Sequence, residues 1–134
     1  MTVELHNNTF ADNDLLFADA PVPLITGGVI HANVFTGGSI GLRVPNGGAG
    51  FVITCNDAWG NDANFEGFDP VAGGNFSAAP NYCDVLNGDF TVASNSPLLA
   101  ANNACAVPIG AFGQGCGPIS IEAGSWGKVK SLYR

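Results

Sequence analysis

Residues 5–10 read LHNNTF, residues 30–35 read IHANVF and residues 54–59 read TCNDAW. Each copy ends on an aromatic residue that has Asn or Asp two positions before it. The aromatics follow one another after 25 and then 24 residues, a period typical of a chain that winds in stacked coils. We expect the rings to point inward and stack at about the 4.8 Å that separates hydrogen-bonded strands. The Asn or Asp before each ring is expected to take the left-handed conformation of a tight corner.

Between these copies, short runs rich in aliphatic residues are separated by turn signals such as Gly27-Gly28 and Gly37-Gly38. Three short strands and three turns in about 25 residues is the layout of a parallel β-helix, whose rungs contact only their neighbours. A β-sandwich, with strands about 8 to 12 residues apart, is the alternative. The sequence predicts an all-β fold, a right-handed parallel β-helix of about three rungs plus a C-terminal capping region.

The 134 residues are enough for a single domain with a continuous core. We divide it into β-helix rungs at residues 1–59, a long loop at residues 60–80, and a C-terminal rung with a capping tail at residues 81–134. The chain enters a rung at Val3 without a preceding cap. We therefore expect self-association through the open N-terminal rung.

The charge balance excludes one class of partner. The net charge is −7, and between Met1 and Gly127 the single Lys or Arg is Arg43. Nucleic-acid binding requires clustered basic residues, so nucleic acid is excluded. No apolar run approaches the roughly 18 to 20 residues that cross a bilayer, and we expect no membrane span.

Four cysteines, Cys55, Cys83, Cys105 and Cys116, indicate an oxidising compartment, in which four thiols allow three pairings. We therefore expect a secreted, extracellular or cell-surface protein. We favour the pairs Cys105–Cys116 and Cys55–Cys83. The alternatives are four small buried hydrophobic side chains and, less favoured because no Cys-x-x-Cys or Cys/His cluster exists, a metal site.

The stretch from Val52 to Cys116 carries a series of short motifs. They are Cys83-Asp84, Gly88-Asp89-Phe90-Thr91, Ser96-Pro97, Asn102-Asn103 and the IGAFGQGC of residues 109–116. The series resembles the ending of bacterial right-handed parallel β-helix repeat proteins, which resemble pectate lyases in fold. Leu98 stands where that family commonly has Cys, so the resemblance implies that one family disulfide is lost.

Oxygen-bearing residues alternate at Asp62, Asn64 and Glu66 before Gly67, as in the first half of a calcium-binding loop. The carboxylate that an EF-hand needs at its twelfth position is missing, because Gly73 stands there. A solvated acidic loop is the competing interpretation. Calcium is the one cofactor for which the sequence offers ligands, and otherwise we expect none.

Five aromatic residues gather around the long loop. They are Trp59, Phe65, Phe68, Phe76 and Tyr82. Exposed rings stack on sugars while Asn and Asp bond the hydroxyl groups, which makes a polysaccharide a candidate partner. The competing interpretation is that these rings pack beneath the loop.

No catalytic constellation stands out, and we assign no catalytic residue. Polysaccharide lyases of the resembled fold typically combine acidic calcium ligands with a basic residue, for which Arg43 is the only interior candidate. We expect a non-catalytic extracellular or cell-surface module with a structural or adhesive role, self-assembling end to end. The alternative is a carbohydrate-binding or polysaccharide-cleaving, lyase-like protein.

Overall fold

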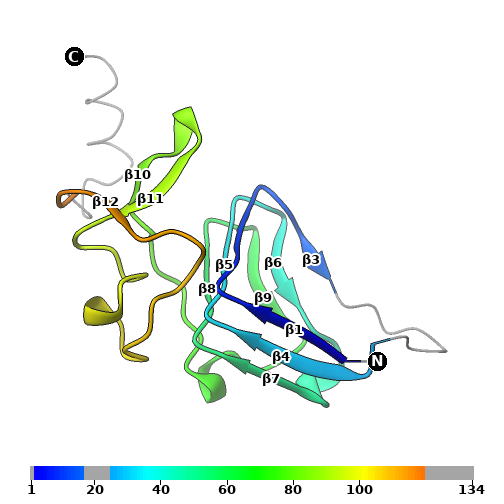
Figure 1. Ribbon diagram of the computed structural model, residues 1–134. Helices are drawn as coiled ribbons and strands as arrows, with labels where there is room; N and C mark the ends of the chain where they lie inside the picture. The colour runs from blue at the N-terminus through cyan, green and yellow to red at the C-terminus, as the bar shows by residue number, and fades with distance from the viewer. Residues whose placement is uncertain (1, 17–24, 120–134) are drawn as a thin grey trace.

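The computed structural model describes residues 2–16 and 25–119, and it is mainly β (Figure 1). The first nine strands fall into three consecutive units of three, and each strand pairs in parallel with the equivalent strand of the next unit. The units are β1 (Thr2–His6), β2 (Thr9–Ala11) and β3 (Leu15–Leu16); β4 (Gly27–His31), β5 (Val34–Thr36) and β6 (Ile40–Arg43); β7 (Phe51–Thr54), β8 (Asp57–Trp59) and β9 (Ala63–Glu66). The result is three separate parallel sheets, ordered β1-β4-β7, β2-β5-β8 and β3-β6-β9. We call β1 to β9 with their turns the repeat body.

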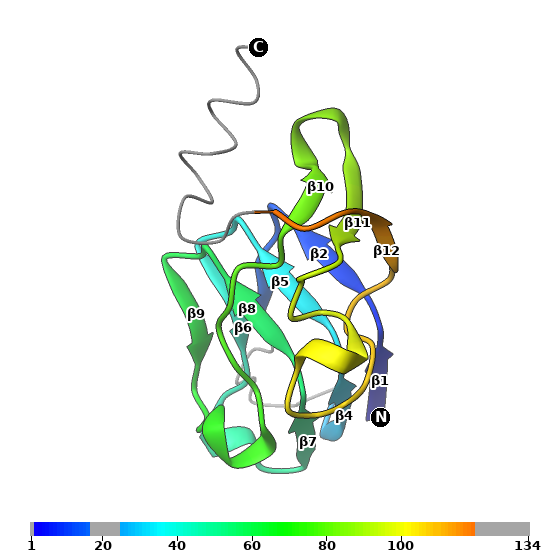
Figure 2. The same ribbon diagram turned by 90° about the vertical axis from the view of Figure 1, so that its left-hand side faces the viewer.

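The C-terminal region, residues 77–119, forms a fourth sheet of different character. Its strands are β10 (Tyr82–Asp84), β11 (Asp89–Ala93) and β12 (Gln114–Cys116). β10 and β11 are antiparallel, β11 and β12 are parallel, and the β10–β11 hairpin projects from the rest of the molecule (Figures 1 and 2). Four 3-10 turns complete the described elements: η1 (Asn46–Gly48), η2 (Val71–Gly73), η3 (Val85–Asn87) and η4 (Ala100–Asn102).

The predicted fold class, a right-handed parallel β-helix, is wrong. The strands lie in several small separate sheets, not in one continuous solenoid, and the fourth sheet contains an antiparallel pair. The reason lies after β9, where the repeat ends except for one parallel bridge between Asp57 and Phe76. The long loop expected at residues 60–80 is also wrong in its first part, because β9 occupies residues 63–66.

An inner core lies among the three parallel sheets. Its rows are Leu5, Ile30 and Ile53; Phe10, Phe35 and Ala58; Leu15, Leu42 and Phe65. The predicted stacking of Phe10 on Phe35 is confirmed, with ring centroids 5.0 Å apart and an interplanar angle of 6°. The same prediction for Trp59 is wrong. Along the β1-β4-β7 and β2-β5-β8 sheets, equivalent residues are 25 apart between the first two units but 23 apart between the next two, so Ala58 takes the inner position and Trp59 is 44% exposed.

A ladder of asparagine side chains runs along one corner of the repeat body. The backbone N–H groups of Asn8, Asn33 and Asn56 each donate to Oδ1 of the next asparagine, at 2.9, 2.9 and 3.0 Å, and the last acceptor is Asn75. The Nδ2 groups of Asn33, Asn56 and Asn75 donate, each at 2.9 Å, to the carbonyls of Leu5, Ile30 and Ile53. The ladder therefore satisfies backbone groups that a turn between two strands would leave unpaired.

The left-handed residue at each corner is not the ladder asparagine but the residue before it. Asn7, Ala32 and Cys55 have φ of 54°, 58° and 57°. That conformation is unfavourable for Ala and Cys by about 1–2 kcal/mol, so the surrounding contacts must hold it in place. The expectation that the ladder residue itself would turn the corner is therefore wrong.

The C-terminal region packs on the outer face of the β2-β5-β8 sheet, where it forms a second core. Val34 from β5 is buried there among Tyr82, Val92, Leu98 and Ile109. Gly110 has φ of 85°, and a Cβ on it would lie 3.1 Å from Val34 Cγ1, so only glycine suits this close approach. This sheet is consequently covered on both faces.

Two disulfides link the four cysteines, but in the pairing that we did not favour. Cys55 is bonded to Cys105, and Cys83 to Cys116. Cys105 lies beside Cys55 because the C-terminal region folds back over the end of β7. Cys116 lies beside Cys83 because β12 joins the sheet that contains β10. Proximity along the chain therefore misled the prediction, since both bonds join segments that only the tertiary fold brings together.

Candidate functional site

Among the described residues, nothing covers the first unit's end of the inner core. β1, β2 and β3 are all edge strands among the described residues. The core side chains of this unit, Leu5, Phe10 and Leu15, are only partly buried, whereas their counterparts Ile30, Phe35 and Leu42 are 0% exposed. We call the surface made by Leu5, Phe10 and Leu15 with the three strand edges the open end.

The asparagine ladder is incomplete at the same end. Asn8 donates through Nδ2 to Asn33 Oδ1 at 3.0 Å, but within the described ranges no donor reaches its own Oδ1. In Asn33 and Asn56 that oxygen accepts both a backbone N–H and an Nδ2 group. Among the described residues, the open end thus presents a side-chain acceptor that is not used as its counterparts in Asn33 and Asn56 are.

The opposite end of the repeat body is largely covered. Gly73 accepts a hydrogen bond from the Cys55 N–H at 3.2 Å, and Phe76 donates through its N–H to the carbonyl of Asn56 at 2.9 Å. Ala58 N–H donates in turn to the Phe76 carbonyl at 3.1 Å. These contacts cover the C-terminal end of β7 and part of the outer edge of β8, so the two ends of the repeat body differ.

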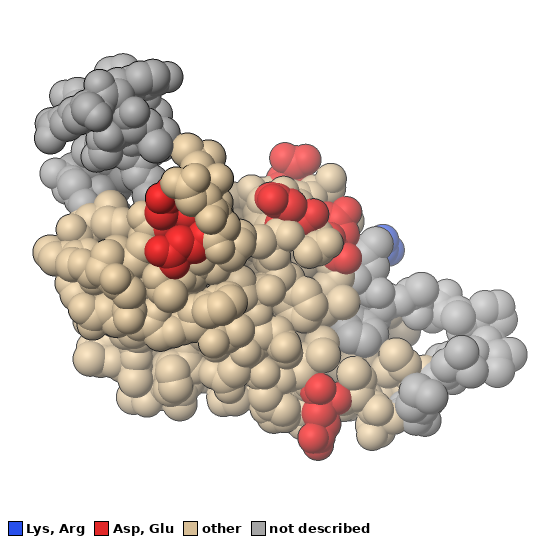
Figure 3. Space-filling model, turned by 45° about the horizontal axis from the view of Figure 1, so that its top comes forward, with Lys and Arg blue, Asp and Glu red and all other residues tan. Residues whose placement is uncertain are grey.

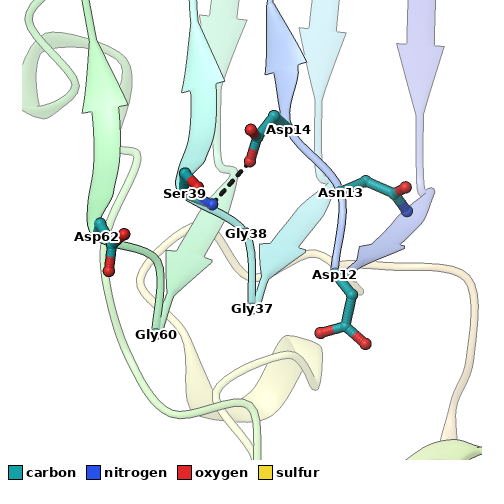
Figure 4. A pocket seen from close by; sticks show the side chains of 8 residues that line it. All are labelled: Asp12, Asn13, Asp14, Gly37, Gly38, Ser39, Gly60 and Asp62. Atoms are coloured by element: carbon teal, nitrogen blue, oxygen red, sulfur yellow. Dashed lines mark hydrogen bonds between the residues drawn. The ribbon is translucent and has the colours of Figure 1, made fainter.

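A polar pocket of about 520 Å³ lies beside the turns that precede β3, β6 and β9 (Figure 4). Its lining residues are Asp12, Asn13, Asp14, Gly37, Gly38, Ser39, Gly60 and Asp62. Asp14 Oδ1 accepts hydrogen bonds from the N–H groups of Ser39 at 2.7 Å and Ile40 at 3.0 Å. In the part of the chain that the structure describes, no three His, Cys, Asp or Glu side chains are grouped so as to hold a metal ion.

The proposed calcium ligands are split between this pocket and a strand. Asp62 lines the pocket, but Asn64 and Glu66 belong to β9. Asn64 Oδ1 already accepts the N–H and the Nδ2 of Asn61, at 3.2 and 3.1 Å, and Glu66 lies opposite Arg43 in the register. The stretch is extended where a calcium loop would curl around an ion. Asp12 and Asp14, which sequence reasoning missed, are the other carboxylates that line the pocket beside Asp62.

The five candidate sugar-binding aromatics do not form one surface. Phe65 and Phe68 pack against the inner core, with ring centroids 5.7 Å apart. Phe76 and Tyr82 belong to the second core, and Trp59 alone is exposed. The packing interpretation therefore describes four of the five rings.

The charged surface is almost entirely acidic in the described parts of the chain, where Arg43 is the single Lys or Arg (Figure 3). The acidic side chains gather in separate groups on the face that Figure 3 shows. Hydrogen bonds from the Thr91 side chain and backbone N–H lower the pKa of Asp89, which lies next to the turn of the β10–β11 hairpin. Such a surface repels anions and attracts basic partners.

Comparison with known proteins finds no matching family model, no matching curated protein and no matching solved structure. The resemblance to bacterial β-helix repeat proteins therefore stays a prediction from short motifs. Across the described residues, no helix has the length and apolar character of a membrane span. Two disulfides are present, as the cysteine content predicted.

Proposed function

We propose that this protein is a non-catalytic, secreted or cell-surface module with a structural or adhesive role, and that it associates with a second copy of itself through the open end. The observation that carries the proposal is the contrast within one row of the core. Phe10 is partly exposed, while Phe35, stacked directly on it, is fully buried. Burying the apolar end and pairing its three edges is the ordinary driving force for strand-to-strand association.

The proposal favours contact between two open ends over head-to-tail stacking. A head-to-tail contact would have to displace the segment of Gly73 to Phe76 that covers β7 and β8. Two open ends meeting about a two-fold axis would leave that cover in place, and such closed symmetric contacts are the commonest in homo-oligomers. Two disulfides support a location outside the reducing cytosol.

A second candidate function is sugar binding at the polar pocket. Trp59 is 44% exposed and precedes Gly60, which lines the pocket that Asp12, Asp14 and Asp62 share. An exposed aromatic ring near a few polar groups has the components of a small-ligand site. Titration with pectin and cellulose oligosaccharides, followed by Trp fluorescence, distinguishes this candidate. Trp59→Ala would remove the sugar-induced change while Trp126 still fluoresces, and it would leave the oligomeric state unchanged.

Light scattering after size exclusion, over a series of protein concentrations, tests the leading proposal. We expect the mass to rise from 13.6 kDa towards twice that value. Phe10→Glu should hold the protein at the monomer mass, because it places a charge in the apolar end. Val71→Glu is the matched control, since Val71 is 79% exposed on η2 beside β7 and away from the open end.

Salt gives a second readout of the same contact. Glu4, Asp12 and Asp14 belong to the first unit, so two open ends bring like charges together. Raising the salt concentration from about 0.01 to about 0.15 M shortens the screening length from roughly 30 to 8 Å and should strengthen the association. A monomer mass at every protein and salt concentration would contradict the proposal.

A further inference from the structure

A buried carboxyl group lies where the repeat body meets the C-terminal region. Asp57, in β8, is 0% exposed, and it occupies the row of the outer sheet face that also holds Thr9 and Val34. Its Oδ1 accepts a hydrogen bond from the Ala78 N–H at 2.9 Å, on the connection that leads to β10. Its Oδ2 has no hydrogen-bond partner among the described residues.

The group that faces Asp57 from β10 is Tyr82. This side chain is 7% exposed, its hydroxyl is likewise buried without a hydrogen-bond partner among the described residues, and its ring packs edge-on against Phe90 at 5.1 Å. Burial raises the pKa of Tyr82 to about 12, a side-chain contact from Thr36 opposes the rise, and the charge of Asp57 adds to it. The remaining neighbours, Val34 in β5 and Phe76 and Ala78 in the connection, carry no charge.

These surroundings favour the neutral form of the carboxyl group. Within the described residues no cation and no second donor compensates a charge on Oδ2, and a buried unpaired carboxylate is costly. Accordingly, burial raises the pKa of Asp57 from 3.8 to about 8, with the Ala78 hydrogen bond opposing the rise. Around pH 7 the group is therefore mainly protonated.

We propose that Asp57 is a proton-operated latch, which holds the C-terminal region on the outer face of the β2-β5-β8 sheet while it is protonated and loosens that contact when it ionises. The latch is independent of any association through the open end. Its moving part is the segment from Phe76 to Tyr82, since this segment supplies both the Ala78 hydrogen bond and the Tyr82 ring. The Cys55–Cys105 disulfide keeps the loosened region attached.

The direction of the pH effect follows from proton binding. In the closed state the pKa of Asp57 is about 8, whereas after opening it is that of an ordinary aspartate, 3.8. The closed state therefore binds more protons between these values, and raising the pH favours opening. The stabilisation of the closed state is complete below about pH 4, and it is lost as the pH rises through 8.

Amide hydrogen exchange measured between pH 5 and 9, with rates corrected for intrinsic base catalysis, tests the latch. We expect protection of residues 76–82 to fall by up to about tenfold per pH unit as far as pH 8 and then to level off. Protection of β4 and β5 should change little. Asp57→Asn should abolish the pH dependence, while Asp62→Asn, which makes the same substitution at an exposed side chain, should retain it.

A titration of the wild-type protein keeps the test valid even if Asp57→Asn fails to fold. The carbon-13 shift of the Asp57 carboxyl group, followed by NMR, should change with a midpoint near pH 8. A midpoint below pH 5 would overturn the proposal. So would equal pH-dependent loss of protection in wild type and Asp57→Asn, or protection of residues 76–82 that does not change with pH.

Discussion

The repeat body and the C-terminal region are held together by different interactions. In the repeat body, equivalent residues of successive units touch one another, as Phe10 does Phe35. In the C-terminal region, single side chains hold irregular backbone segments together by hydrogen bonds. Asn103 Nδ2, for example, donates to the carbonyls of Pro97, Leu99 and Val107 at 2.9, 3.0 and 2.9 Å. Both disulfides have at least one cysteine in this region, and the Cys83–Cys116 bond lies entirely within it.

The difference shows how the same polar residue serves two purposes. Asparagines in the repeat body form a ladder whose members make equivalent hydrogen bonds. The effect of substituting one of them therefore depends mainly on its position in the ladder. In the C-terminal region, Asn102 and Asn103 bond two different sets of backbone carbonyls. Substitutions in the repeat body therefore test whether the loss of stability increases from the open end inward. Substitutions in the C-terminal region test individual hydrogen bonds and disulfides.

The largest effect should come from the middle of the inner core. Phe35→Ala removes a fully buried ring and should lower the free energy of unfolding by about 3–5 kcal/mol. Phe10→Ala, at the partly buried open end of the same row, should cost clearly less. Urea unfolding followed by circular dichroism measures both. Equal costs would mean that the open end is covered in solution.

Removing the bond between the two regions should come next. The double variant Cys55→Ala, Cys105→Ala should lose about 2–4 kcal/mol, because the bond closes a separation of 50 residues. Alanine can adopt the left-handed conformation at position 55 at no greater cost than cysteine, since Ala32 adopts it at the equivalent corner. Thermal melts of oxidised protein supply the measurement.

The matched variant for this bond is Cys83→Ala, Cys116→Ala, whose bond lies within the C-terminal region. Hydrogen exchange should show that it loosens the β10-β11-β12 sheet and spares the ladder around Asn56. The interface on the β2-β5-β8 sheet should open only in the first double variant. An identical exchange pattern in both would contradict the division into two regions.

A smaller, graded effect should appear along the ladder. Asn56→Ala leaves the N–H and Nδ2 of Asn33 and the carbonyl of Ile30 without these hydrogen-bond partners. It should lower the free energy of unfolding by about 1–3 kcal/mol. Asn8→Ala leaves only partly buried groups without partners and should cost less than about 1 kcal/mol. Unfolding free energies from urea titrations give the comparison, and a reversed order would refute the gradient.

The repeat could be predicted from the sequence only where the interval between its copies was matched by the interval between their aromatic residues. Phe10 and Phe35 revealed the first interval, because two aromatic residues in matching hexapeptides mark one inward position. The next interval is two residues shorter, 23 against 25, and the nearby Trp59 offered a false match to the ring series. The small side chain of Ala58 occupies the inner position in β8, because Phe65 also packs into this part of the inner core.

Contacts that depend on the path of the chain after β9 could not be predicted. The pairing of Cys55 with Cys105 requires the C-terminal region to fold back across the sheet, and no local spacing encodes that path. The pocket joins Asp62 to Asp12 and Asp14 across three units, so a search for ligands along one loop missed two of its carboxylates. Asp57 gave no signal as a buried acid, because a single aspartate in a short strand normally faces solvent.

Because the β2-β5-β8 sheet is buried on both faces, its middle strand should tolerate few amino-acid replacements. Val34 and Phe35 are neighbours in β5, point to opposite faces and are both fully buried. In a library that samples every amino acid at each position, β5 should accept the narrowest range of replacements. In β4, by contrast, the partly exposed Val29 and His31 flank the buried Ile30, so these two positions should accept a wider range of replacements than Ile30.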